Sequence, residues 1–180
     1  MSVKTVASYT CAIFSVIVLV LCLCTNYWIE YQIIDYDTQI GKENRRYQSR
    51  AGLWEFCTRV KEISHSDYGA LKCEPVGDKE ETGLSDSKRS AILAMYILAM
   101  LCTLVAFIFV TVYCITDKYF FPVTRSAILF FVSAVFVIIG LAIYTDNYID
   151  KKVQFSWSYG AGWSAAAMYI ISMILVLADK

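Results

Sequence analysis

The chain has 180 residues, 58% of them hydrophobic and 15% aromatic, with a formal net charge of zero. This apolar share exceeds that of an ordinary soluble domain. The absence of net positive charge gives no electrostatic support for nucleic-acid binding. The apolar residues collect in four blocks with the charges between them, which predicts an integral membrane protein whose surroundings are membrane lipid.

The first block is uncharged from Val6 to Thr25, long enough to cross the hydrocarbon core. We expect a first transmembrane helix at 6–26. A signal peptide is the rival interpretation, because Lys4 provides a positive start. The run is longer than a signal-peptide core, and the bulky residues after it make a poor cleavage site. Tyr27 and Trp28 follow where an aromatic anchor at the headgroups is expected.

Residues 27–90 form one long polar loop. Period-two alternation and β-prone composition predict strands at 27–36, 52–60 and 68–73, and these would form a small antiparallel sheet. A sheet of this size needs support from the helix ends and from a cross-link. Residues 78–87 are expected to be a connection into the second helix.

Three further membrane helices are expected at 91–115, 126–145 and 156–178. A short loop at 116–125 and another at 146–155 would connect them. Arg89, just before the second helix, is expected to reach the membrane interface or to pair with a carboxylate of the long loop. The fourth block opens with a second interfacial aromatic cluster, Phe-Ser-Trp-Ser-Tyr at 155–159.

Cys57 and Cys73 are the only cysteines of the long loop. We expect them to form a disulfide, which would stabilise the loop by about 3 kcal/mol on the chain-entropy model. Two free thiols are the alternative. A zinc site is a weaker one, because His65 would be the only histidine ligand.

A disulfide places the long loop in an oxidising compartment. We therefore expect a multi-pass protein of the plasma membrane with both termini in the cytoplasm. Lysine and arginine number twelve on the proposed outer side and four on the inner side, which opposes this orientation. However, the number of basic residues does not predict the membrane orientation of long loops, and the two short loops carry equal numbers of basic residues.

The apolar blocks carry no ionisable Asp, Glu, Lys, Arg or His in their interiors, which argues against transport sites. No nucleophile–base set or metal motif occurs, so we expect neither enzymatic activity nor a cofactor. In the fourth block, small residues recur at every fourth position, which permits close helix contacts: Ser158, Gly162 and Ala166. We expect packing inside one bundle in preference to a homodimer face.

These residues resemble the superfamily of claudins, peripheral myelin proteins, epithelial membrane proteins and lens fibre membrane proteins. The matching positions are Trp28, Gly52, Leu53, Trp54, Cys57, Cys73 and Arg89. The later segments 142–145 and 155–163 look closest to the lens fibre membrane and claudin-domain-containing proteins. The cysteines are spaced more widely than in typical claudins.

The resemblance implies an all-α membrane protein, a left-handed four-helix bundle with a small extracellular antiparallel sheet held by a disulfide. In that arrangement, Trp28 and Trp54 would wedge the sheet onto the helix ends, and Gly52 would allow close backbone approach. The exposed loop tips would be left to meet partners.

The resemblance implies three functions. The first is a structural, adhesive or membrane-organising role at cell contacts. The second is an auxiliary subunit of an ion channel or receptor, like the related calcium-channel gamma subunits. The third is a paracellular barrier or pore. Partners would be other membrane proteins, in self-association or in a channel complex.

Overall fold

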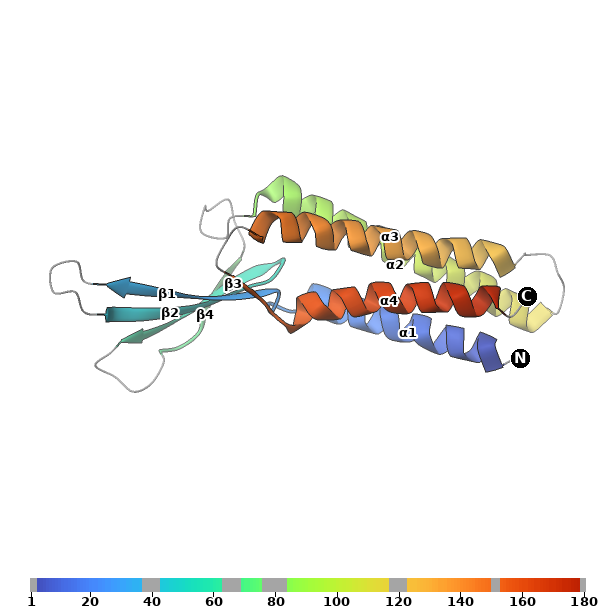
Figure 1. Cartoon of the computed structure of the whole chain (residues 1–180), viewed down its shortest axis with the longest axis horizontal. Coiled ribbons are helices and arrows are strands. Elements are labelled where there is room, and N and C mark those ends of the chain that lie inside the picture. Colours follow the sequence, from blue (N-terminus) through green and yellow to red (C-terminus); the bar gives the residue numbers. More distant parts are fainter. Residues whose placement is uncertain are drawn as a thin grey trace.

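The computed structural model describes residues 3–36, 43–62, 69–75, 84–116, 123–149 and 153–178. Within these residues, four helices are long and apolar enough to cross a membrane. They lie side by side as one elongated bundle, with both termini at the same end (Figure 1). The helices are α1 (Val3–Cys24), α2 (Asp86–Thr116), α3 (Val123–Tyr148) and α4 (Trp157–Leu177).

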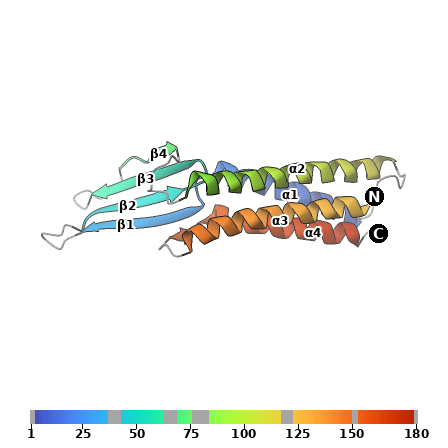
Figure 2. The same ribbon diagram turned by 90° about the horizontal axis from the view of Figure 1, so that it is seen from above.

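An antiparallel sheet projects from the opposite end of the bundle, so the termini and the sheet lie at opposite ends (Figures 1 and 2). Its strand order is β4-β3-β2-β1-β5. The strands are β1 (Ile29–Tyr36), β2 (Glu43–Ala51), β3 (Glu55–Glu62), β4 (Lys72–Pro75) and β5 (Gln154–Phe155). In a four-span protein, this arrangement puts both termini on one side of the membrane and the sheet on the other.

The helix limits differ most from expectation in α2, which begins at Asp86 rather than at 91. The hydroxyl of Ser85 accepts a hydrogen bond from the amide of Lys88 (3.4 Å). This is a typical helix N-cap interaction. Arg89 pairs with Asp86 one turn earlier, at 2.7 Å. The end of the expected connection 78–87 is therefore helical, while residues 76–83 lie outside the described residues.

Two strands are present that the sequence does not predict, β2 and β5. The expected strand 52–60 begins only at Glu55, because residues 52–54 form the turn from β2 to β3. The expected strand 68–73 is observed as Lys72–Pro75, which leaves only part of it in the sheet.

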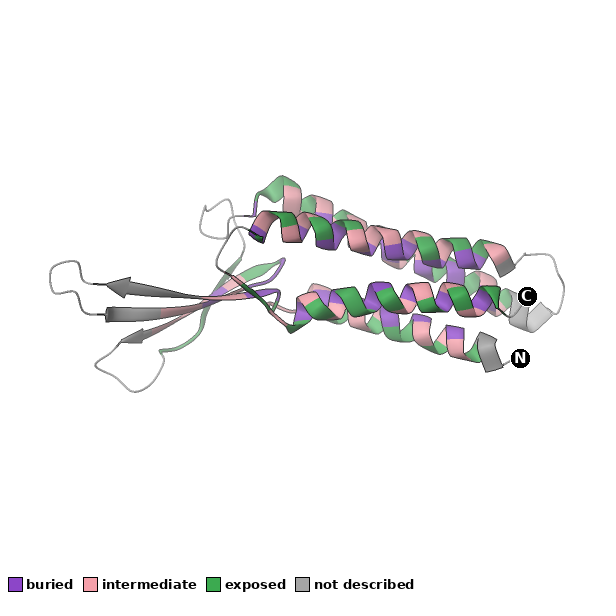
Figure 3. Cartoon of the chain, in the orientation of Figure 1, coloured by how far each residue is buried: buried purple, intermediate pink, exposed green. Residues whose placement is uncertain are grey.

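The bundle buries its inner faces and exposes apolar side chains on its outer faces (Figure 3). Such an outer surface suits lipid. Hydrogen bonds also join the helices: the hydroxyl of Ser8 on α1 donates to the carbonyl oxygen of Ser172 on α4 (3.0 Å), and that of Thr103 on α2 donates to the hydroxyl of Ser133 on α3 (3.0 Å). In lipid, such polar contacts and close packing take the place of the hydrophobic effect.

The small residues of α4 are buried inside this bundle. The hydroxyls of Ser158 and Thr25 lie 2.7 Å apart. A side chain at Gly162 would come within 3.0 Å of Leu141 and 3.2 Å of the Tyr96 hydroxyl, and Ala166 is 2% exposed. The structure therefore places Ser158, Gly162 and Ala166 at contacts within one chain.

Candidate interaction site: the disulfide-linked sheet

The disulfide joins Cys57 of β3 to Cys73 of β4, directly opposite each other in the sheet register. Cys57 is 3% exposed, whereas every residue of β4 is exposed. The bond therefore attaches an exposed edge strand to the body of the sheet. Free thiols, the first alternative, are not what the structure contains.

A metal centre at the cysteine pair does not fit these residues either. The carboxylate of Glu55 lies close to both sulfur atoms. However, disulfide sulfurs are not the thiolates that zinc binds. The same carboxylate accepts a hydrogen bond from the side-chain amide of Asn26 (2.7 Å). His65 lies outside the described residues.

Trp28 connects the sheet to the bundle. It is fully buried, and its indole N–H donates to the carbonyl oxygen of Cys22 at the end of α1 (2.8 Å). Its ring centroid lies 4.8 Å from that of Tyr144 on α3 and 5.8 Å from that of Tyr96 on α2. The expectation that Trp28 sits at the headgroups is therefore wrong, because the chain turns inward directly after α1.

The turn formed by Gly52, Leu53 and Trp54 lies against the end of α1. Leu53 is fully buried, but Trp54 is 52% exposed. The Trp54 indole N–H donates to the carbonyl oxygen of Leu23 (2.7 Å). Of the two expected wedges, only Trp28 is inserted between the elements, and Trp54 lies on the outside of the junction.

Gly52 is needed because two backbones meet there. A Cβ atom at this position would come within 2.7 Å of the Asn26 Cα and of the Thr25 carbonyl oxygen. Neither is a movable side-chain atom. The expected close approach at Gly52 is therefore present in the structure.

Replacing Gly52 with alanine is expected to destabilise the folded protein by about 1–3 kcal/mol through overpacking. Gly160→Ala is the matched control, because no heavy atom lies within 4 Å of a Cβ at that position. In the helix α4 this second change leaves stability unchanged or raises it. Thermal unfolding of the purified protein in detergent measures both. If both substitutions changed the unfolding temperature equally, the backbones at Gly52 would not be in close contact.

The second connection between sheet and bundle is β5, which pairs with the start of β1. Ile29 lies opposite Phe155, and the amide of Ser156 donates to the carbonyl oxygen of Trp28 (2.9 Å). The amide of Trp28 in turn donates to the carbonyl oxygen of Ala51 (3.1 Å). The base of the sheet is therefore held by two segments that lie far apart in the sequence, the link after α1 and the residues just before α4.

The sheet has one face that is mainly apolar. Residues opposite each other on neighbouring antiparallel strands share a face. By this register, Tyr31, Phe56 and Val60 lie on the face that buries Ile29 and Ala51 at its base. The rings of Tyr31 and Phe56 stack with their centroids 6.2 Å apart.

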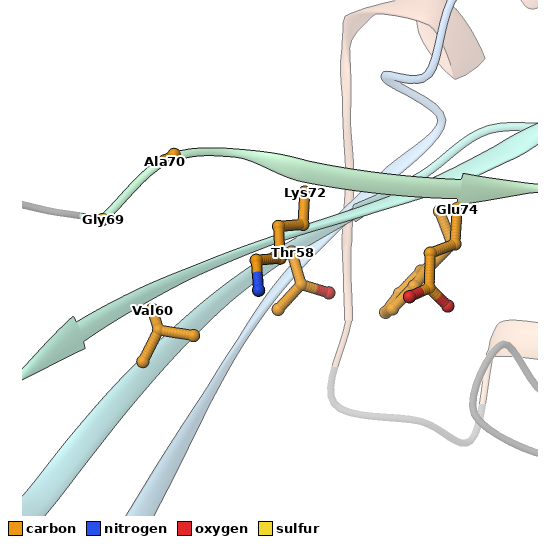
Figure 4. A pocket seen from close by; sticks show the side chains of 7 residues that line it. Thr58, Val60, Gly69, Ala70, Lys72 and Glu74 are labelled. Atoms are coloured by element: carbon orange, nitrogen blue, oxygen red, sulfur yellow. The ribbon is translucent and has the colours of Figure 1, made fainter.

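The apolar face contains a hollow of about 360 Å³ between β3 and the segment leading into β4 (Figure 4). Side chains of β3 form its apolar part, and Lys72 and Glu74 of β4 add opposite charges. Its lining residues are Phe56, Thr58, Val60, Gly69, Ala70, Lys72 and Glu74. The hollow therefore offers apolar contact beside charges of both signs.

The other face of the sheet is charged near its base. The carboxylate of Glu30 accepts a hydrogen bond from the side-chain amide of Gln48 and lies 3.7 Å from Nε of Arg50. Nη1 of Arg50 donates to the hydroxyl of Tyr27 (2.9 Å), and the guanidinium lies over the Tyr27 ring, 4.8 Å from its centroid. The sequence pattern does not indicate this role of Arg50, because the role depends on the register of β2.

Arg89 is placed by the structure at the start of α2, where it pairs with Asp86. Of the two expected arrangements, the pairing with a carboxylate is the one observed. Lys88 beside it reaches α3, with its ammonium 3.4 Å from the carboxylate of Asp146. These contacts stabilise the first turn of α2.

Comparison with known proteins gives one family and a set of relatives. Residues 1–176 match the model of the PMP-22/EMP/MP20/Claudin family. The human lens fiber membrane intrinsic protein is 26% identical over 176 residues, which cover 93% of this chain and 86% of that protein. The bovine and rat proteins of the same name match over the same shares, at 26% and 25% identity. None of these relatives is named as an enzyme.

Proposed function

Because the chain belongs to the PMP-22/EMP/MP20/claudin family, we propose that it is a structural or adhesive protein of cell contacts, acting through its disulfide-linked sheet. It is a multi-pass membrane protein with four spanning helices. We further propose that the sheet lies outside the cell and both termini lie in the cytoplasm, because a disulfide persists in an oxidising compartment.

One observation carries the proposal: the sheet projects beyond the helix ends and presents an apolar face with a hollow (Figures 1 and 4). An apolar patch rimmed by polar residues is typical of a protein–protein contact. The half-buried Phe56 and Val60 provide the apolar part of that surface.

A mixed-cell experiment tests the proposal. Cells expressing a fluorescently tagged chain are co-cultured with expressing and non-expressing neighbours, and the tag is quantified along each type of contact. Enrichment is expected only where both neighbours express the protein. Val60→Glu in the hollow is expected to abolish the enrichment.

Arg59→Glu is the matched control, because Arg59 precedes Val60 on β3 and lies on the opposite face. It should leave the enrichment intact. Equal enrichment at every contact would contradict adhesion. Co-purification of a channel in mild detergent would instead favour an auxiliary subunit, and altered ion permeability of an epithelial layer would favour a paracellular role.

A further inference from the structure

Exposed aromatic side chains gather on the outer ends of α1 and α4, beside the charged face of the sheet. Tyr27 is 36% exposed, and Trp54 and Trp157 are each 52% exposed. These residues come from three separate segments: the link after α1, the turn before β3 and the start of α4. Their gathering is therefore a product of the fold and not of one sequence run.

The level of these rings relative to the bilayer follows from the spans. The first span ends at Cys24 and the fourth begins at Trp157. The Trp54 indole is held at the end of the first span by its bond to Leu23. Tryptophan and tyrosine favour the boundary between hydrocarbon and headgroups. We therefore expect all three rings to lie at that boundary.

Arg50 adds a cation at the same place. Its guanidinium lies over the Tyr27 ring, and that ring in turn lies 5.9 Å, centroid to centroid, from the ring of Trp157. A guanidinium has five N–H donors and matches the geometry of a phosphate. The Glu30 carboxylate lies 3.7 Å from Nε of Arg50, and Nη1 of Arg50 donates to the Tyr27 hydroxyl (2.9 Å).

The cluster is one-sided. Among the described residues at the outer ends of α2 and α3, the exposed large hydrophobic residue is Ile149, and no exposed aromatic residue is present there. The start of α2 instead carries Asp86, Lys88 and Arg89. The exposed rings of Tyr27, Trp54 and Trp157 therefore lie on the side of α1 and α4.

We infer that Tyr27, Arg50, Trp54 and Trp157 form a binding site for the phosphate-bearing headgroup of a phospholipid, and that this site ties one side of the sheet to the bilayer surface. Arg50 pairs with the phosphate, and the aromatic rings cover the glycerol and headgroup region. This inference is independent of the proposed adhesive function, since it needs no neighbouring cell.

The first test uses tryptophan fluorescence in vesicles of phosphatidylcholine brominated near the headgroup end of the acyl chains. The chain carrying Trp157→Phe and Trp163→Phe keeps Trp28 and Trp54. Adding Trp54→Phe leaves the buried Trp28 as the shielded reference. Emission from the first variant should be quenched strongly, and that from the second much less. Equal quenching would overturn the inference.

The second test addresses Arg50. The full chain in detergent is titrated with 1-palmitoyl-2-oleoyl-phosphatidylcholine, and bound lipid is counted by native mass spectrometry. Arg50→Gln is expected to weaken retention of the tightest lipid by roughly tenfold, the loss typical of a hydrogen bond to a charged group. Arg59→Gln, on the same face but on β3, is the control and should retain it.

The Arg50→Gln and Arg59→Gln variants must both show an intact Cys57–Cys73 bond on a non-reducing gel, so that misfolding is excluded as the cause of weaker lipid retention. Equal lipid retention by Arg50→Gln and the unmodified chain would overturn the assignment of Arg50. Loss of retention in both arginine variants would indicate unspecific charge attraction and would also overturn it.

Discussion

Trp28→Ala is expected to destabilise the protein by about 3–5 kcal/mol, the range for truncating a large aromatic residue in a core. The ring fills the space between the sheet base, Tyr96 and Tyr144. Its removal also leaves the Cys22 carbonyl without the indole donor. The loss should therefore include a cavity and an unmet hydrogen bond, and thermal unfolding in detergent measures it.

Trp163→Ala is the appropriate control, since it removes the same side chain from a position that is 42% exposed on α4. Its cost should stay near that of an ordinary surface change, about 0.5 kcal/mol. Were the two variants to unfold at the same temperature, Trp28 would not be the packing centre of the junction.

Removing the disulfide should release the edge of the sheet and leave the helices in place. The double variant Cys57→Ser, Cys73→Ser loses the stabilisation by the disulfide, about 3 kcal/mol. The edge of the sheet is therefore expected to open roughly a hundredfold faster. Hydrogen exchange of 69–75 reports it. Strand β4 is affected most, because it is short, fully exposed and paired only with β3 among the described strands.

Exchange in α2 and α3 should hardly change, since their contacts lie within the bundle. Cys24→Ser serves as the control, because Cys24 is an exposed free thiol at the end of α1. Unchanged exchange at 69–75 in the double variant would mean that backbone pairing alone holds β4.

The sequence predicts the bundle well because membrane helices follow from uncharged length alone. The sequence pattern places the start of α2 at 91, five residues too late, although Ser85 and Asp86 have the composition of a helix N-terminus. The charged residues around them indicated a loop. Polar loops and helix N-termini use the same residue types, so the two are separated only by a tertiary contact such as that of Lys88 with Asp146 on α3.

Strand β2 could not be predicted from its own residues, Glu-Asn-Arg-Arg-Tyr-Gln-Ser-Arg-Ala. It lacks apolar alternation, yet it lies between β1 and β3. Its polar residues are accommodated by partners on neighbouring strands, as Gln48 and Arg50 are by Glu30. The wedge position expected for both tryptophans is observed for Trp28 and not for Trp54, which is 52% exposed, because burial depends on the direction in which the chain leaves α1.

The pairing of β5 with β1 has a consequence for biosynthesis. The first helix to leave the ribosome packs against the last one, through Ser8 and Ser172, and the base of the sheet needs Phe155 and Ser156. Neither contact can form until the fourth segment has been translated and inserted. Until then, the first helix and the strands that follow it lack their final packing partners.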